Sequence, residues 1–239
     1  MSNSHRSIIV TRKIGFDKGL KVCQGPVPHV IKPSMVKTKE RILLVSNDLF
    51  NRNGVQAITT NHIAKSLKMS PGNLYFHYHN KEEILQELFK RMCRETYQVW
   101  KPKSSRALTP MEFIDFNFEI YWKYRFFHRE MYTLRRRDPV LALQWKKHIF
   151  KMMGLMKGLY KVWVRKEILT PLKNVDEMTY IAESLLAMST TYLQFFESAD
   201  KVPSKQALER GRKHVSRMLY PYTIGQTRDA FDIYFKSLS

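Results

Sequence analysis

A group of hydrogen-bonding and aromatic side chains lies at the start of a predicted short helix near residue 70. Asn73, Tyr75, Phe76 and His77 stand at its exposed N-terminal end. Amide, phenol and imidazole groups can contact base edges and phosphate oxygens, and a short helix that presents them at its N-terminal end suits the major groove of a DNA duplex. The chemistry indicated is therefore binding, with no bond made or broken.

Two predicted helices and a tight turn must position these side chains. Thr59 supplies a capping oxygen for the first helix, and Ile63 and Leu67 follow four residues apart on one apolar side. The turn is Lys68-Met69-Ser70, whose serine can cap the second helix. Pro71 then takes the first helical position, where a missing N–H leaves no hydrogen bond unmade.

A larger set of residues, in specific order and spacing, surrounds this helix pair. The set is Ile42 through Phe50, Gly54, Thr59, Ile63-Ala64, Ser70-Pro71-Gly72, Leu74-Tyr75, His77-Tyr78 and Lys81-Glu82-Glu83-Ile84. It resembles the DNA-binding domain of TetR/AcrR-type bacterial transcriptional regulators, from about Thr38 to Leu88.

The resemblance implies an all-α homodimer with an N-terminal three-helix domain and a larger ligand-sensing helical domain. We accordingly expect a flexible basic arm at residues 1–36, a helix-turn-helix domain at 37–84 and a sensing and dimerisation domain at 85–239, with the dimer interface within 175–219. The implied partners are a double-stranded operator, which we expect to be palindromic, an effector and a second copy of the chain. The residues of the second domain indicate that the effector is small and apolar or amphipathic. The implied DNA-binding residues are Thr59, Thr60, Asn61, Ser70, Pro71, Gly72, Asn73, Tyr75, His77 and Lys81.

Physical roles can be assigned to some of these residues. Thr60, Tyr75 and Lys81 suit phosphate contacts, which fix the register of a protein on DNA but carry no sequence information. Asn73 could read adenine through two hydrogen bonds, worth about 1–3 kcal/mol of discrimination. The alternative for Tyr75 is packing against the first helix of the pair, because a phenol is amphipathic. Leu74 is expected in the core.

Two positions depart from the pattern of the family. Leu67 and Lys68 stand where the family usually has Ala-Gly. A lysine in a left-handed turn would cost about 1–2 kcal/mol relative to a residue without Cβ strain, which favours a different turn here. Ser46 replaces a usual core alanine, and its hydroxyl could bond back to a carbonyl of its own helix.

Composition and charge are consistent with this interpretation. The chain has 239 residues, 44% of them hydrophobic, enough for one or two domains with a sizeable core. Its net charge of +20 favours polyanionic partners, although the excess is spread over both halves of the chain. Cys23 and Cys93 lie far apart without metal-ligand spacing, so we expect free thiols in a reducing compartment. No apolar run is long enough for a membrane span or a secretory signal, and we expect a cytoplasmic protein without metal or cofactor.

The first 36 residues have no helical period and contain six Lys and Arg against one acid, Asp17. One hypothesis places this arm along the DNA backbone or in the minor groove. The alternatives are an untethered tail, or a segment upstream of a true start at Met35.

Start and stop signals divide the rest of the chain into helices. A first helix should run from Thr38 to Arg52 with a left-handed cap at Asn53-Gly54, and Asn80 with Glu83 should form a capping box for a long fourth helix. The remaining predicted features are a linker at Lys101 to Ala107, one aromatic helix from Pro110 to beyond Phe127, an arginine turn at 135–137, and helices starting at Pro139, after Asn174, at Ser204 and near Thr227.

An effector pocket is predicted among the aromatic residues and methionines of the second domain, because ligand cavities are lined mostly by apolar and aromatic groups. Arg125 or Arg129 could meet an anionic group of the effector. The alternative is that these residues only pack the bundle. The expected pocket residues are Trp122, Arg125, Phe126, Arg129, Tyr132, Trp145, Met152, Met156, Tyr160 and Tyr192.

Two other functional classes can be weighed against a regulator. An enzyme is disfavoured because the chain has no phosphate-binding glycine loop, no GxSxG elbow and no HExxH pair. We therefore expect no catalytic residue. A protein-interaction module that keeps the helix-turn-helix without specific DNA binding is the remaining alternative, although the polar positions of the reading helix are intact.

Overall fold

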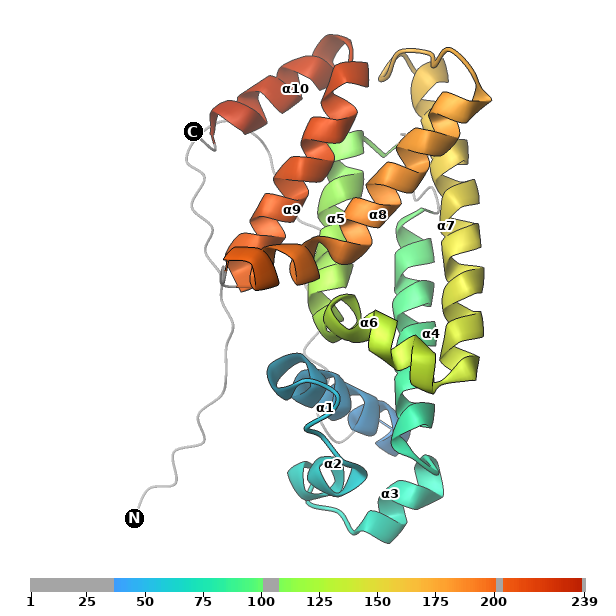
Figure 1. The fold of residues 1–239 in the computed structure, drawn as a ribbon, viewed down its shortest axis with the longest axis vertical. Helices are drawn as coiled ribbons and strands as arrows, with labels where there is room; N and C mark the ends of the chain where they lie inside the picture. Colours follow the sequence, from blue (N-terminus) through green and yellow to red (C-terminus); the bar gives the residue numbers. More distant parts are fainter. Residues whose placement is uncertain (1–36, 101–107, 201–203, 238–239) are drawn as a thin grey trace. The chain divides into compact units, whose positions relative to one another are not determined.

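A computed structural model describes residues 37–100, 108–200 and 204–237, and these fold entirely into helices and their connections (Figure 1). The predicted arm, Cys23 and the predicted linker at 101–107 lie outside the described residues. The α-helices are α1 (Thr38–Asn53), α2 (Thr60–Ser66), α3 (Pro71–His77), α4 (Lys81–Val99), α5 (Pro110–Lys123), α6 (Arg125–Arg137), α7 (Pro139–Arg165), α8 (Val175–Asp200), α9 (Ser204–Leu219) and α10 (Gly225–Lys236).

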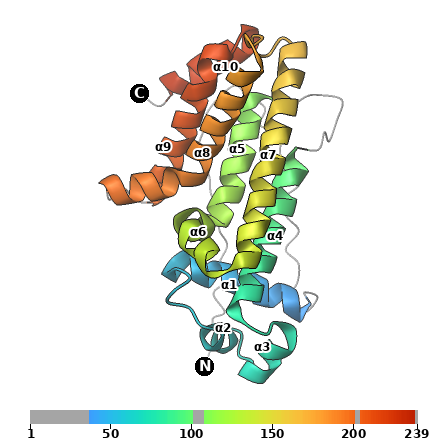
Figure 2. The ribbon, with the colours of Figure 1, turned by 45° about the vertical axis from the view of Figure 1, so that its right-hand side comes forward.

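Helix α4 connects the N-terminal helices to the rest of the bundle. Its first half packs in the core of α1, α2 and α3 through Ile84 and Leu88, which are almost fully buried. Tyr97 and Trp100, near its end, pack against the core of the C-terminal helices. Figure 2 shows α4 running from α3 to a position beside α7 and α5. One rigid helix therefore belongs to both cores.

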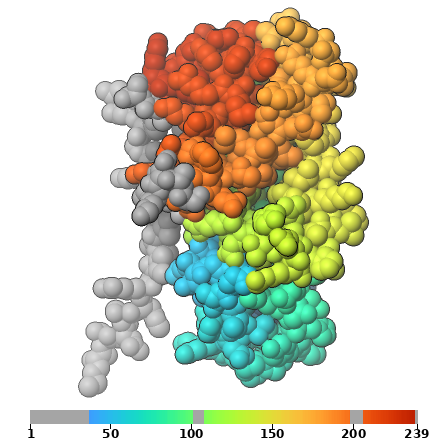
Figure 3. Space-filling view, in the orientation of Figure 1, coloured from blue at the N-terminus to red at the C-terminus, as the bar shows by residue number. Residues whose placement is uncertain are grey.

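Helix α6 and the start of α7 also contribute to the core of the N-terminal helices. Phe126 and Phe127 are buried there, with Phe126 5.3 Å from the ring of Phe50 and Phe127 5.4 Å from that of Phe89. In the space-filling view the atoms of α6 lie directly on those of α1 (Figure 3). The sequence boundary that we predicted between residues 84 and 85 thus separates segments that share one core.

Most predicted helix starts are confirmed because they depend on local hydrogen bonds. Thr109 and Glu112 form a complete capping box before Pro110. Asp138 caps α7 by accepting from the amides of Val140 and Leu141, and Asn174 accepts from the amide of Glu177 at the start of α8.

Two predictions about the aromatic segment are wrong. The helix expected from Pro110 to beyond Phe127 breaks at Tyr124, whose backbone angles of −116° and 36° are not helical. The arginines at 135–137 form the last turn of α6, where cations stabilise the negative end of the helix dipole, and do not lie in a separate turn.

The last three helices cover one side of the bundle, and α8 and α9 pack on each other most extensively. Gly211 of α9 permits this approach, because a Cβ there would lie 2.5 Å from the ring of Tyr192. An isolated bridge between Leu169 and Thr223 connects the segment after α7 to the segment before α10. No described helix has both the length and the apolar character that crossing a bilayer would require.

Candidate nucleic-acid interface and sensor core

The first helix of the predicted pair is capped at both ends. Thr59 accepts from the amide of His62 through its hydroxyl, and the His62 ring accepts from the Thr59 amide, both at 3.3 Å. At the other end, the amide of Lys68 donates to Lys65 and that of Met69 to Ala64, which is a Schellman motif. Lys68 has φ of 54°, so the turn is left-handed in spite of the lysine. Our prediction of a different turn is wrong.

Helix α3 is oriented by one buried residue. Ser70 accepts from the amide of Asn73 at 3.2 Å, Pro71 takes the first position, and Leu74 is fully buried. Gly72 and Phe76 lie two residues to either side of Leu74, about 200° around the helix, and so face outward. Phe76 is 82% exposed. It was not among the predicted contact residues, although it stands in the same polar segment.

Most predicted DNA-binding residues share the surface around α2 and α3. Tyr75 and Thr60 are joined by a hydrogen bond of 3.0 Å between their hydroxyls, which holds the phenol toward α2. Tyr75 remains 44% exposed, so this packing does not bury it. Thr60, His77 and Lys81 are half-buried, and the exposed ones are Thr59, Asn61, Ser70, Pro71, Gly72, Asn73 and Tyr75.

Lys81 has a bracing role that was not predicted. Its ammonium donates to the carbonyls of Val55 and Ile58, each at 2.9 Å, in the connection between α1 and α2. The side chain thus ties the start of α4 to the segment before the reading pair. A phosphate contact by Lys81 stays a prediction, but the observed bonds already occupy two of its three donors.

The capping box expected at the start of α4 is formed only in part. Asn80 accepts from the amide of Glu83 at 2.8 Å, but the Glu83 carboxylate accepts from the backbone and ring of His79 and not from the Asn80 amide. These bonds from His79 lower the pKa of Glu83. An anionic carboxylate is thereby held at the positive end of the α4 dipole.

The N-terminal helices are also tied to α6. Glu130 accepts from the Val55 amide at 2.9 Å, just beyond Gly54. Gly54 has a positive φ of 78°, but its ψ of 157° lies outside the left-handed helical cap that we predicted. Asn51 donates to the carbonyl of Lys123 at 2.8 Å and accepts from the amide of Phe126 at 3.1 Å. The side-chain amide of Asn51 therefore forms hydrogen bonds with one carbonyl and one amide group at the break between α5 and α6.

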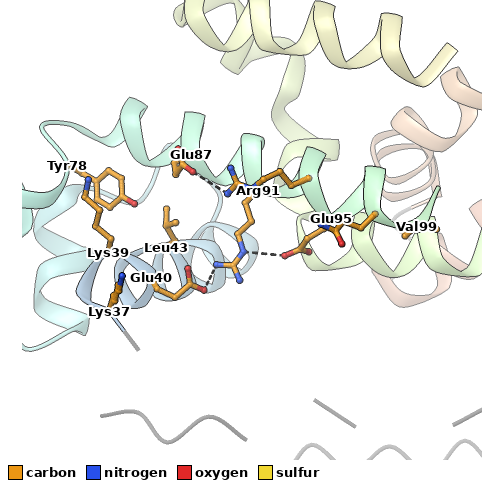
Figure 4. A pocket seen from close by; sticks show the side chains of 11 residues that line it. Lys37, Lys39, Glu40, Leu43, Tyr78, Glu87, Arg91, Glu95 and Val99 are labelled. Carbon is orange, nitrogen blue, oxygen red and sulfur yellow. Dashed lines mark hydrogen bonds and ion pairs between the residues drawn. The ribbon is translucent and has the colours of Figure 1, made fainter. Parts of the chain in front are cut away.

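A groove of about 840 Å³ lies between α1 and α4 (Figure 4). Several of its charged side chains form ion pairs: Arg91 bridges Glu40 at 2.5 Å and Glu95 at 3.2 Å. Tyr78 forms part of the wall, and its burial, next to nearby carboxylates, raises its pKa to about 12. The ion pair between Arg91 and Glu40 joins the two walls of the groove and so holds α1 against α4.

The interior of the C-terminal helices contains two small neighbouring cavities, each of about 20 Å³, between α5, α7, α8 and α9. A volume of that size holds about one water molecule. Phe113, Met156, Leu185 and Leu219 line both cavities, and Asn117 lines one of them. The sequence prediction missed Phe113 and Asn117, and the aromatic spacing of α5 was the only signal that could have indicated them.

The structure separates the predicted effector residues into different regions. Met152, Met156 and Tyr160 line the cavities, and their contact with an effector stays a prediction. Tyr192 is fully buried next to Phe118, with ring centroids 4.9 Å apart, but does not line them. The predictions for the others are not met: Phe126 and Trp145 pack in the core of the N-terminal helices, and Tyr132 is 61% exposed on α6.

The two arginines expected to meet an anion have other partners. Arg125 stacks on Trp122 with its guanidinium carbon 4.7 Å from the ring centroid, and donates to that residue's carbonyl. Arg129 forms a bidentate ion pair with Glu197, with both distances 2.7 Å. Neither arginine lines a cavity, so the prediction that they meet the effector there is not supported.

Several buried polar side-chain atoms have no hydrogen-bond partner in the described part of the chain. Nε1 of Trp100 and Oδ1 of Asn117 belong to residues that line the cavities, whereas Nε2 of His128 and the Tyr192 hydroxyl belong to residues that do not. Burial lowers the pKa of His128 to about 4, so this histidine is neutral at pH 7. The cavity walls are thus mainly apolar, with Lys157 as their one charged residue among those described, and they offer a few groups for hydrogen bonds.

A second buried histidine lies between α4 and α7. His148 approaches the Tyr97 hydroxyl at 2.9 Å and the Cys93 thiol at 3.3 Å. Burial lowers the pKa of His148 to about 4 and raises the pKa of Cys93 to about 12. Cys93 is therefore a protonated, structural thiol, as expected for a free cysteine.

These features define the class of protein. A short capped helix presented by two bracing helices, and joined through a shared helix to a larger helical bundle, is the architecture of a helix-turn-helix regulator. A family model described as "Bacterial regulatory proteins, tetR family" matches residues 42–88, and one described as "Bacterial transcriptional repressor" matches residues 88–231. The chain belongs to the TetR family of bacterial transcriptional regulators, which is not a family of enzymes.

Individual relatives agree with this family. The regulator QacR of Staphylococcus aureus is 35% identical over 74 residues, which are 31% of this chain and 39% of QacR. The regulator UidR of Escherichia coli is 37% identical over 51 residues, 21% of this chain and 26% of UidR. The chain therefore matches less than half the length of either relative.

Solved structures match a larger part of the chain. A TetR-family regulator from Marinobacter aquaeolei VT8 has a TM-score of 0.75 and 27% identity, covering 84% of this chain and 98% of that one. The ketosteroid transcriptional regulator KstR2 of Mycobacterium tuberculosis has a TM-score of 0.56 at 14% identity, covering 79% of this chain and 96% of that one, and shows the shared fold alone. These relatives are all regulators, and none of them favours the alternative of a protein-interaction module.

Proposed function

We propose that this chain is a ligand-responsive repressor that binds a palindromic operator as a homodimer. The observation that carries the proposal is the presentation of α3: Leu74 anchors one side in the core, while Gly72, Asn73 and Phe76 face outward. A helix held in this way can enter a major groove with its N-terminal residues at the base edges. In this assignment Asn73 reads adenine, and Thr60 and Tyr75 contact phosphates as a hydrogen-bonded pair.

The homodimer in this proposal is built through α8 and α9. The outer side of α8 carries Tyr180, Ala187, Thr191 and Phe195, all exposed and separated by seven, four and four residues. This spacing places them on one stripe of the helix, with small residues between aromatic ones. Such a stripe suits a helical seam, in which small residues allow close approach.

The effector in this proposal is an uncharged, mainly apolar molecule bound between α5, α7 and α8. The cavity walls carry Met152 and Met156, whose flexible side chains can rearrange to enlarge a site. The carbonyl oxygen of Asn117 is buried there without a partner in the described chain and could accept a hydrogen bond from the effector. No charged side chain among the described residues lines this cavity, and Lys157 lines only the neighbouring one, so an anionic group has no counterion at this site.

Selection of bound duplexes from a random pool tests the DNA-binding part. The expected result is one palindrome whose half-site centres are about one helical turn or a multiple apart. Failure to enrich any sequence, or a monomeric chain in sedimentation at the working concentration, would refute the proposal. Ala187→Arg should produce monomers with weakened operator binding, whereas Lys161→Glu on the exposed side of α7 should remain dimeric.

Thermal shift measurements test the effector class. Neutral aromatic or alicyclic compounds should raise the melting temperature more than fatty acids or aromatic acids of similar size. Asn117→Ala should reduce the response to compounds with a hydrogen-bond donor and leave that to pure hydrocarbons unchanged. A larger response to the acids would overturn the assignment.

A further inference from the structure

Phe76 is a large apolar side chain of α3 that lies outside the hydrophobic core. It is 82% exposed and contacts the edge of the His77 ring, with centroids 5.2 Å apart. A single exposed phenylalanine is common on protein surfaces and needs no explanation by itself. Its position, however, is specific, because Leu74 fixes the rotation of this helix and places Phe76 nearly opposite the core.

The neighbours of Phe76 leave it at the outermost point of α3. Tyr75 is held toward α2 by its hydrogen bond to Thr60. Gly72 lies one turn earlier on the same side, and a Cβ built on it has no atom within 4 Å. Asn73, also exposed, borders this side. The outward face of α3 is therefore defined by Gly72, Asn73 and Phe76.

We propose that this face reads A·T pairs and that the Phe76 ring packs on the 5-methyl group of a thymine. This inference rests on the proposed placement of α3 in the major groove. Thymine is the only one of the four standard bases that carries a methyl group in this groove, and a phenyl ring contacts that group favourably. A phenyl ring offers no hydrogen bond to the acceptors and amines of a G·C pair.

Asn73 and Phe76 fit neighbouring positions of one half-site. Three helical residues rise about 4.5 Å along the helix, close to the roughly 3.4 Å that separates successive base pairs. Asn73 pairs best with adenine through N6 and N7, and Phe76 with thymine. The half-site read by α3 therefore contains two A·T pairs that are adjacent or separated by one base pair. At the base pair that Phe76 contacts, affinity should depend on the thymine methyl group alone.

The test uses duplexes that differ only by that methyl group. Deoxyuridine replaces thymine at one position at a time in the selected operator, and affinity is measured at constant salt. At one position per half-site the substitution should weaken binding about fourfold, the size expected for losing the burial of one methyl group. At the same position 5-methylcytosine should bind better than cytosine by a similar factor.

Variants assign the effect to Phe76. In Phe76→Ala the ratio of thymine to deoxyuridine affinity should fall to about one, while in Phe76→Leu it should stay above one. Phe150→Ala provides a matched control, because Phe150 is 81% exposed on α7, away from the proposed interface. It should keep the full ratio.

The outcomes separate this inference from the proposed function. If Asn73→Ala weakens operator binding but no thymine responds to deoxyuridine in the native chain, α3 enters the groove and the methyl contact is wrong. An unchanged ratio in Phe76→Ala would also overturn it. If neither Asn73→Ala nor Phe76→Ala changes affinity, the placement of α3 itself fails.

Discussion

Arg129 and Glu197 form a bidentate ion pair that joins α6 to α8, and the same guanidinium donates to the carbonyl of Asn51 at 3.2 Å near the end of α1. One side chain therefore connects the helices of the proposed DNA-binding, sensing and dimerisation parts. A movement of α8 relative to α6 must change the geometry of this connection.

We expect Arg129→Gln to lower the free energy of unfolding by about 1–3 kcal/mol, because it leaves the Glu197 carboxylate without its bidentate donor. Glu197→Gln in the same chain should recover part of the loss. Urea denaturation of the native chain, both single variants and the double variant gives the coupling energy. Strictly additive effects would show that the pair contributes nothing to stability.

A substitution at Lys81 can show whether this side chain braces the fold or contacts a DNA phosphate. Lys81→Met removes two hydrogen bonds to the carbonyls of Val55 and Ile58, so it should destabilise the fold by about 1–3 kcal/mol. If Lys81 acts only as a brace, operator affinity should fall without a change in its dependence on salt. A phosphate contact would instead reduce the salt slope by about 0.9 for each subunit. Lys65→Met, on the exposed side of α2, serves as the stability control.

Lys68 occupies a left-handed position with φ of 54°. Lys68→Gly should stabilise the chain by about 1 kcal/mol, because glycine has no Cβ strain in this conformation. Lys65→Gly, within α2, should have the opposite effect by a similar amount, since glycine lowers helix stability. Thermal denaturation of both variants provides the comparison. A destabilised Lys68→Gly variant would contradict the expectation.

Ser46 is fully buried, and its hydroxyl has no partner among the described residues. The bond to a carbonyl of its own helix that we predicted is not formed. Ser46→Ala should therefore raise the free energy of unfolding by about 1–2 kcal/mol, because it removes a desolvated hydroxyl. Ser66→Ala, at an exposed position, should be close to neutral. Equal effects in urea denaturation would count against this account.

The two buried histidines predict a loss of stability in mild acid. Burial lowers the pKa of His128 and of His148 to about 4, whereas an unfolded histidine titrates near 6.5. Between these values the unfolded chain binds protons that the folded chain does not, so stability falls as pH decreases from about 6.5 toward 4. Each histidine can contribute up to about 3 kcal/mol to this loss.

Urea midpoints measured across that range check the prediction. His148→Gln should flatten the dependence. Proton NMR titration of the native chain provides a direct reading of the two ring pKa values. Values near 6.5 for both rings would show that burial does not have the stated effect.

Local sequence signals are enough to predict where most helices begin and which side of the reading helix is buried. Ser70 with Asn73, and Thr109 with Glu112, are capping contacts between residues three apart, so their signals are local. The single apolar anchor Leu74 likewise follows from the spacing of the segment. The resemblance to the family between Thr38 and Leu88 also rests on residues that are close together in the sequence.

The connections between these elements depend on contacts between residues that are distant in the sequence, and local signals do not predict them. The break at Tyr124 depends on Asn51, which supplies partners for the free backbone groups of Lys123 and Phe126 from more than 70 residues away. The pairing of Arg129 with Glu197, and the use of Lys81 as a brace, are likewise long-range contacts. A long cationic side chain has several partners within reach, and the packing of the helices selects among them.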